Sequence, residues 1–169
     1  GYDGKLLGII SMVDELRNNA NQTISKLRDL GIKNVIMLTG DHEIKAAETA
    51  KTLGLDGYYS ELLPEDKLHI VEKLKTDGKT VIFVGDGIND APSLAESNVG
   101  IAMQRGADIA RVSADVTLLE DDISIVADIK ELADKTIDKV SQNYRMTIGI
   151  NSAILMLATL GMLSPAMTS

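Results

Sequence analysis

A short decapeptide, Gly-Asp-Gly-Ile-Asn-Asp-Ala-Pro-Ser-Leu over residues 85–94, constrains this chain more than any other feature. It directly follows the apolar run Val-Ile-Phe-Val over residues 81–84. Four β-prone apolar residues in a row predict a buried strand. Gly85 and Gly87 allow the backbone to turn sharply where that strand ends. The sequence therefore predicts a buried strand whose carboxyl end opens into a tight polar turn.

Two carboxylates and one amide stand in that turn, on Asp86, Asn89 and Asp90. Oxygen ligands of this kind suit Mg²⁺, which usually takes one or two carboxylates together with phosphate oxygens and water. A plainer interpretation is open for Asp90, which also fits the N-cap of a helix that carries Pro92 in its first turn. The turn is thus a candidate metal and phosphate site.

Composition narrows the class of protein. The chain has 169 residues, of which 44% are hydrophobic but only 3% aromatic, so its core must be aliphatic. The net charge is −8 and no basic run is present, which argues against nucleic acid as a partner. There is no cysteine, so disulfides and thiolate metal sites are excluded for this stretch.

Short apolar runs alternate with amphipathic segments along most of the chain. The expected strands cover residues 5–12, 34–38, 57–60, 80–84, 99–103 and 115–119. The expected helices cover residues 14–30, 43–53, 65–75 and 122–143, with a small helix between the last two strands. This alternation predicts an α/β fold with a doubly wound parallel sheet.

Polar clusters follow three of the expected strands, at Asp14, at residues 39–41 and at residues 86–90. Ligands of such sheets bind outside the carboxyl ends of the strands. The three clusters are therefore expected to meet on one rim of the sheet.

Thr39 and Lys67 add a hydroxyl and a cation to this rim. Thr39 offers its hydroxyl and its backbone amide to a phosphoryl oxygen. The alternative is ordinary turn chemistry, with Asp41 capping the next helix. Lys67 falls in the first turn of the helix that starts at Pro64, where the helix dipole disfavours a lysine. A ligand-binding task would explain it, and a solvated lysine is the alternative.

The last part of the chain differs from the rest. Residues 146–163 carry no charge, which predicts a transmembrane helix that Ser164-Pro165 then breaks. A buried helix of a soluble protein is the alternative, and Asn151 and Ser152 favour it. We expect these segments: an α/β domain over 1–125, a connecting helix over 126–145, the span over 146–163 and a partial loop over 164–169.

Several of these motifs together resemble the P-type ATPases, members of the haloacid dehalogenase-like superfamily. They are Thr39-Gly40-Asp41, the Pro64…Lys67 pair and Gly-Asp-Gly-Ile-Asn-Asp-Ala-Pro over residues 85–92. The resemblance covers essentially the whole chain, and the last motif is highly specific. The tail, with Asn143-Tyr144-Arg145 before a single apolar stretch, is similar to the heavy-metal-transporting branch.

The resemblance implies a role for each matching residue. Asp86 would ligate Mg²⁺, and Thr39 and Lys67 would hold the phosphoryl group. Asn89 and Asp90 would order that site, while Gly40 and Asp41 would lie near ATP. The family's phosphorylated Asp-Lys-Thr-Gly-Thr motif is not present in this sequence. We therefore expect a fragment that is inactive by itself.

The resemblance also implies partners: ATP or phosphate, Mg²⁺, a transported transition-metal cation, membrane lipid and the remaining domains and spans of a multi-pass parent. The α/β part would be cytoplasmic. Two alternatives stay open. One is a soluble phosphatase of the same superfamily, although residues 1–20 contain no Asp-x-Asp. The other is a non-enzymatic, membrane-anchored module that binds Mg²⁺ and phosphate.

Overall fold

The computed structural model describes residue 16 and residues 19–85, 88–103 and 112–161. The chain divides into two compact units, residues 1–124 and residues 125–169. Each unit is considered by itself below. The expected strand over residues 5–12, Asp14 and Asp86 lie outside the described residues, and so does most of the small helix expected after residue 103.

All strands of the first unit pair in parallel. β1 (Ile36–Leu38) pairs with β2 (Gly57–Tyr59), and β3 (Ile82–Gly85) pairs with β4 (Val99–Ala102), which pairs with β5 (Val116–Thr117). The expected parallel α/β class is confirmed. The single continuous sheet is not found: the described strands form one two-stranded and one three-stranded sheet. Apolar runs predict which residues form strands, but not which strand edges pair.

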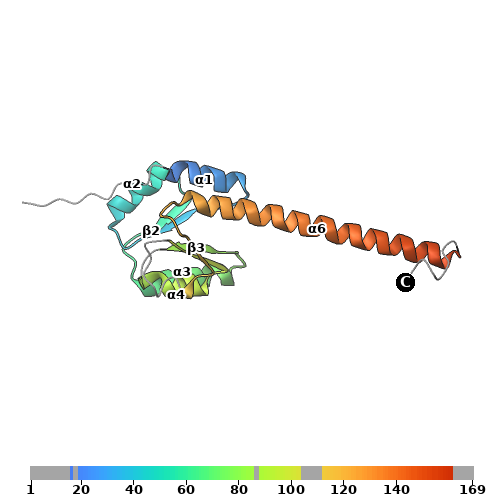
Figure 1. Cartoon of the computed structure of the whole chain (residues 1–169). Coiled ribbons are helices and arrows are strands. Elements are labelled where there is room, and N and C mark those ends of the chain that lie inside the picture. Colours follow the sequence, from blue (N-terminus) through green and yellow to red (C-terminus); the bar gives the residue numbers. More distant parts are fainter. Residues whose placement is uncertain (1–15, 17–18, 86–87, 104–111, 162–169) are drawn as a thin grey trace, which may run out of the picture. The chain divides into compact units, whose positions relative to one another are not determined.

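Helices connect successive strands within each sheet. α1 (Ala20–Asp29) precedes β1, α2 (Glu43–Leu53) joins β1 to β2, and α3 (Pro64–Thr76) precedes β3. The short η1 (Ile88–Asp90) and α4 (Ala91–Glu96) join β3 to β4. Figure 1 shows α3 and α4 side by side below β3, and these two helices are in contact.

Local sequence explains several helix ends. Pro64 opens α3, where its missing N–H is not needed. Gly54 ends α2 with a φ of 61°, and Gly31 follows α1 with a φ of 87°. Both glycines adopt the left-handed conformation that commonly closes a helix.

The beginning of the first helix differs from our expectation. We predicted a helix over residues 14–30. The helix instead begins at Ala20, and the side chain of Leu16 is exposed. Asn19 precedes the helix and its amide donates to the Asp122 carboxylate. An asparagine favours the position just before a helix, which competes with the apolar periodicity.

The core of the first unit lies in the three-stranded half. Val71, Phe83, Leu94 and Ala102 form one buried cluster, and Leu38, Val81 and Ala114 pack against it. Met103 is also buried, as its place at the end of an apolar strand predicted. The cluster contains one aromatic ring, in keeping with an aliphatic core.

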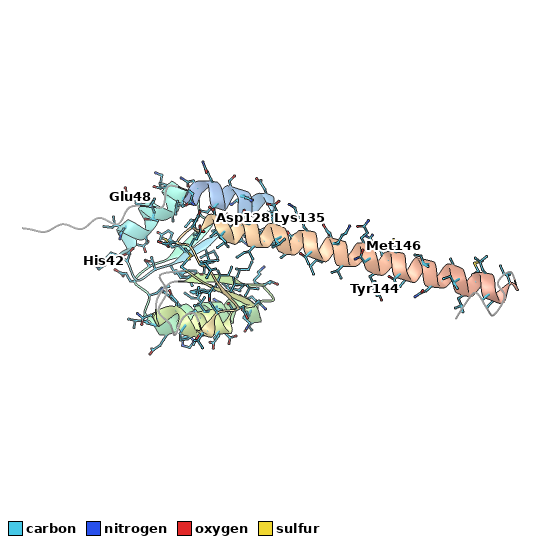
Figure 2. All side chains as sticks on the ribbon, in the orientation of Figure 1. His42, Glu48, Asp128, Lys135, Tyr144 and Met146 are labelled. Carbon is cyan, nitrogen blue, oxygen red and sulfur yellow. The ribbon has the colours of Figure 1, made fainter. Side chains whose placement is uncertain are left out.

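The second unit consists of α6 (Ser124–Thr159), which begins in the last residue of the first unit. It is one continuous helix where we expected a connecting helix and a span. Tyr144 and Met146 are exposed on it (Figure 2). Among the described residues, no helix combines the length and the apolar character needed to cross a membrane.

The transmembrane helix predicted over residues 146–163 is therefore not found among the described residues. α6 ends at Thr159, within that uncharged stretch. Residues 162 and 163 lie outside the described part.

Candidate functional site

A lysine and an aspartate that are far apart in the sequence meet in an ion pair. Lys67 Nζ donates to Asp90 Oδ1 at 2.8 Å. The two side chains are only 18% and 10% exposed. Solvent ions screen such a sheltered pair weakly. The structure thus brings together two predicted site residues, one from the first turn of α3 and one from the start of α4.

Asp90 occupies the N-cap position of α4, but its side chain makes no capping hydrogen bond. The plainer interpretation, in which Asp90 only caps a helix, is therefore wrong. The end of β3 explains how the carboxylate is held. A Cβ placed on Gly85 would lie 2.9 Å from Asp90 Oδ2, closer than real Cβ atoms approach. A glycine at the end of β3 is what makes room for the Asp90 carboxylate.

Thr39 lies directly after β1. Its hydroxyl oxygen accepts from the Asp41 N–H at 3.0 Å, so the turn interpretation is confirmed. Its hydroxyl hydrogen is not used by that bond and can still be donated. The backbone amide that we expected to be available is not, because it donates to the Tyr59 carbonyl at 3.0 Å.

Asp41 does not cap α2, contrary to the capping alternative. His42 occupies the N-cap position of that helix, and no side chain makes a capping hydrogen bond. The Asp41 carboxylate instead lies 3.3 Å from Lys45 Nζ, one turn along. The interaction is exposed, so it contributes little to stability.

The segment between β2 and α3 joins the Thr39 turn to the helix of Lys67. We call residues 60–63 the connector. The Leu62 N–H donates to the Thr39 carbonyl at 3.1 Å. The Glu61 N–H donates to the Asp41 carbonyl at 2.9 Å. These bonds hold the connector alongside the Thr39 turn, beyond the end of the β1–β2 ladder.

The connector then leads directly into α3. The Leu63 N–H donates to Asp66 Oδ2 at 2.8 Å, and the Lys67 N–H donates to the Leu63 carbonyl at 3.3 Å. Backbone hydrogen bonds therefore link Thr39 to the connector, and the connector leads into the first turn of α3, where Lys67 pairs with Asp90. The turn after β1 and the ion pair at the end of β3 are thus joined through the backbone of the connector.

Comparisons with known proteins identify the family of the chain. A family model described as haloacid dehalogenase-like hydrolase matches residues 2–98, more than half of the chain. The chain belongs to the haloacid dehalogenase-like hydrolases. A second model with the same description matches residues 67–143. The first match includes Thr39, Lys67 and Asp90.

Relatives of this haloacid dehalogenase-like chain are heavy-metal P-type ATPases, which confirms the resemblance found in the sequence. The zinc-exporting P-type ATPase of Mycobacterium marinum is 45% identical over 99% of this chain. The manganese-exporting P-type ATPase of Mycobacterium tuberculosis is 46% identical over 99%. The chain spans only 23% of the length of either relative.

A solved structure shows the same fold. The crystal structure of a zinc-transporting PIB-type ATPase in its E2.Pi state is 40% identical and superimposes with a TM-score of 0.82. The match covers 89% of this chain and 24% of that one. The long helix, which lies outside the first family match, is therefore part of the likeness as well.

The remaining predicted residues of the haloacid dehalogenase-like site are exposed or lie outside the described residues. Asn89 lies in η1 with an exposed side chain, and Gly40 is exposed beside the connector. Asp86 lies outside the described residues. Within the described part, no three acidic or histidine side chains group closely enough to hold a metal. The described carboxylate of Asp90 is engaged by Lys67, so the expected Mg²⁺ ligand remains Asp86.

An acidic residue that the sequence did not single out stabilises the Thr39 side. Glu43, the first residue of α2, accepts from Ser60 Oγ and from the Tyr58 hydroxyl, the latter at 2.6 Å. These hydrogen bonds, that of Ser60 first, lower the pKa of Glu43. The same contact raises the pKa of Tyr58. The cluster ties the end of β2 to the start of α2.

The connector lies beside the candidate site, and sequence reasoning did not single it out. Residues 60–63, Ser-Glu-Leu-Leu, carry no turn signal such as Gly or Asn. Only the spacing between the strand and Pro64 could have drawn attention to them.

Proposed function

We propose that this chain is the carboxyl-terminal part of the phosphorylation domain of a heavy-metal-transporting P-type ATPase. The parent would couple ATP hydrolysis, through an aspartyl-phosphate, to the movement of a transition-metal cation across a membrane. One observation carries the proposal: a sheltered Lys67–Asp90 pair beside Gly85, in a chain similar over nearly its whole length to such ATPases.

Lys67 would supply the positive charge for a phosphoryl oxygen. In phosphoryl transfer, positioning and charge neutralisation do most of the work. Asp90 keeps the ammonium in place before a phosphoryl group arrives, since a sheltered ion pair fixes the direction of a long side chain. Thr39 would add a hydroxyl hydrogen bond to the same group.

The other predicted residues have supporting roles in this proposal. Asp86 would hold Mg²⁺, which supplies charge neutralisation on the phosphoryl oxygens when bound. Asn89 would help to order the loop that contains Asp86. Gly40 and Asp41 would lie near ATP, and the exposed surface of both residues leaves them accessible.

The phosphorylated aspartate would come from a part of the parent that this sequence does not include, because no Asp-Lys-Thr-Gly-Thr motif is present. The chain alone would therefore not turn over ATP. In the parent, a multi-pass membrane protein, the α/β part would face the cytoplasm and meet the remaining domains and spans. The transported ion stays open among zinc, manganese, copper and cadmium.

The deciding experiment uses the full-length parent. It is incubated with ATP carrying a radioactive terminal phosphate, with each candidate metal ion added separately, and acid-stable phosphoenzyme is measured. We expect labelling that depends on one or more of these ions and is removed by hydroxylamine, as an acyl phosphate would be. A parent that accumulates no phosphoenzyme with any of them would contradict the proposal.

A matched pair of variants connects that result to this chain. Lys67→Met should lower the rate of phosphoenzyme formation about 100-fold, the usual effect of losing one charge-stabilising donor. Glu48→Gln, on the exposed side of α2, should leave it unchanged (Figure 2). Thermal unfolding of both variants verifies that the loss is not a loss of folding.

A further inference from the structure

One residue of the connector has an unusual backbone conformation. Glu61 has a φ of 54°, and it is the only non-glycine residue with a positive φ in the described part of the chain. Side chains other than Gly, Asn and Asp rarely adopt this left-handed region. Such a conformation persists only where the surrounding structure holds it, and it is found preferentially at functional sites.

Contacts on both sides of the residue hold this conformation. The Glu61 N–H donates to the Asp41 carbonyl at 2.9 Å. Its carboxylate lies 2.9 Å from His42 Nδ1. Both partners belong to the turn that follows Thr39. The strained residue is therefore attached to that turn by its backbone and by its side chain.

The neighbours of Glu61 show what the strain achieves. Before it, the Tyr59 carbonyl accepts from the Thr39 N–H, and after it, the Leu62 N–H donates to the Thr39 carbonyl. Tyr59 and Leu62 thus both form a hydrogen bond with Thr39, although they are not adjacent in the sequence. The left-handed step at Glu61 turns the chain between them, so that both face Thr39.

The same step sets the close approach of the connector to the turn. A Cβ placed on Gly40 would lie 3.4 Å from the Leu62 carbonyl oxygen, an ordinary contact distance with little room to spare. Leu63 then positions the first turn of α3, where Lys67 stands. A different conformation at residue 61 would therefore shift Lys67 relative to Thr39.

We propose that Glu61 is a positioning residue: its left-handed backbone fixes the spacing between Thr39 and Lys67, so that both groups reach one phosphoryl group. The inference rests on the proposed function, because it assigns Glu61 a task in that site. It concerns the backbone of residue 61 and not its charge. The contact with His42 is exposed, His42 being 93% exposed, and is a minor support.

The test uses four variants of Glu61 in the full-length parent and orthovanadate as a mimic of the phosphoryl group. Glu61→Gly and Glu61→Asn tolerate the left-handed region, whereas Glu61→Val does not. Glu61→Gln removes the charge and keeps the shape of the side chain. Half-inhibition of ATPase activity by orthovanadate is measured for each, and thermal unfolding verifies folding.

We expect Glu61→Val to raise the orthovanadate concentration for half-inhibition about tenfold, because a β-branched residue is disfavoured in the left-handed region much more strongly than glutamate is. Glu61→Gly, Glu61→Asn and Glu61→Gln should stay close to the parent. A purely structural role would lower the unfolding temperature of Glu61→Val without moving this value. If Glu61→Val does not accumulate, the smaller β-branched variant Glu61→Thr replaces it, with a shift in the same direction.

Two outcomes would overturn the inference. One is wild-type orthovanadate inhibition in Glu61→Val, or in Glu61→Thr where that variant is used. The other is an equal loss in the Gly and Gln variants, which would assign the effect to the side chain. Failure of the proposed function can be told apart from failure of this inference, because the unaltered parent would then form no phosphoenzyme from ATP.

Discussion

The two sheets of the first unit are stabilised in different ways. The three-stranded half, which comprises β3, β4, β5, α3 and α4, contains the buried apolar cluster around Leu94. The two-stranded half, which comprises β1, β2 and α2, buries mainly the small side chains Ala46 and Ala50. Ile36 and Tyr59, on its strands, are exposed. Apolar packing dominates in one half, and polar contacts dominate in the other.

An exposed group of hydrogen bonds shows this for the two-stranded half. Arg28 donates to the Gly54 carbonyl at 2.7 Å and to the Asp56 carboxylate at 2.9 Å. The Val35 N–H, just before β1, donates to the same carboxylate at 2.8 Å. Arg28 and Asp56 together thereby connect the end of α1, the end of α2 and the start of β1.

The difference has a consequence for the site. The Lys67–Asp90 pair belongs to the three-stranded half, while Thr39, Gly40 and Asp41 belong to the two-stranded half. Regions with few buried apolar contacts open locally at lower cost than packed cores. The part around Thr39 is therefore expected to open locally at lower cost than the part around Lys67 and Asp90. The connector joins the two.

The largest expected effect compares a buried residue of the three-stranded half with an exposed strand residue of the two-stranded half. Leu94→Ala should lower the free energy of unfolding by about 3 kcal/mol, because Leu94 is fully buried and its removal leaves a cavity. Ile36→Ala, at an exposed strand position, should cost less than about 1 kcal/mol. Urea unfolding of the chain measures both, and equal losses would remove the distinction between the halves.

A smaller effect on the free energy of unfolding, of opposite sign, is expected for Ser93 in the three-stranded half. Ser93 is fully buried in α4, and within the described residues its hydroxyl has no hydrogen-bond partner. Ser93→Ala should therefore raise the free energy of unfolding by about 1 kcal/mol, since an unsatisfied buried hydroxyl is costly. Thermal unfolding measures the change. A destabilised variant would show that the hydroxyl is bonded after all.

The smallest expected effect concerns Asp56 in the two-stranded half, whose contribution to stability depends on pH. The Val35 N–H, followed by the Arg28 guanidinium, lowers the pKa of Asp56 below its ordinary value of 3.8. A lowered pKa stabilises the fold above the ordinary value, and this contribution disappears as the pH falls towards the folded pKa. Asp56→Asn should lower the unfolding temperature at neutral pH, by less than the shift for Ser93→Ala.

The difference between Asp56→Asn and the parent chain should shrink as the pH falls from about 4, where the unfolded carboxyl becomes protonated, towards the lower pKa of the native carboxyl. Thermal unfolding across this range makes the comparison, with Glu48→Gln as the control for loss of an exposed charge. A difference that is independent of pH would show that the Asp56 charge has no part in the two-stranded half.

The sequence predicted those parts of the fold that depend on local patterns. The strands that became β1 to β5 and the helix after Pro64 follow from apolar runs and from helix start signals. Lys67 was identified because its charge opposes the dipole of that helix. The parallel arrangement followed from alternation, and it placed Thr39 and Asp90 at carboxyl ends of strands.

What the sequence could not predict depends on long-range contacts. The division into two sheets is decided by edge pairing, which no local pattern encodes. The uncharged stretch over residues 146–163 predicted a span, whereas α6 ends at Thr159 within that stretch. Glu61 was missed because its left-handed backbone is imposed by the Thr39 turn and not by its own preference.

The central claim is that the two halves share one site, with Thr39 and Lys67 acting on the same phosphoryl group. A double-mutant cycle of Thr39→Ala and Lys67→Met in the full-length parent tests it, with phosphoenzyme formation from ATP as the readout. Groups that act as a unit give non-additive losses. We predict that the fold-loss in phosphoenzyme formation of the double variant is about tenfold smaller than the product of the fold-losses of the two single variants. A loss equal to that product would contradict the account.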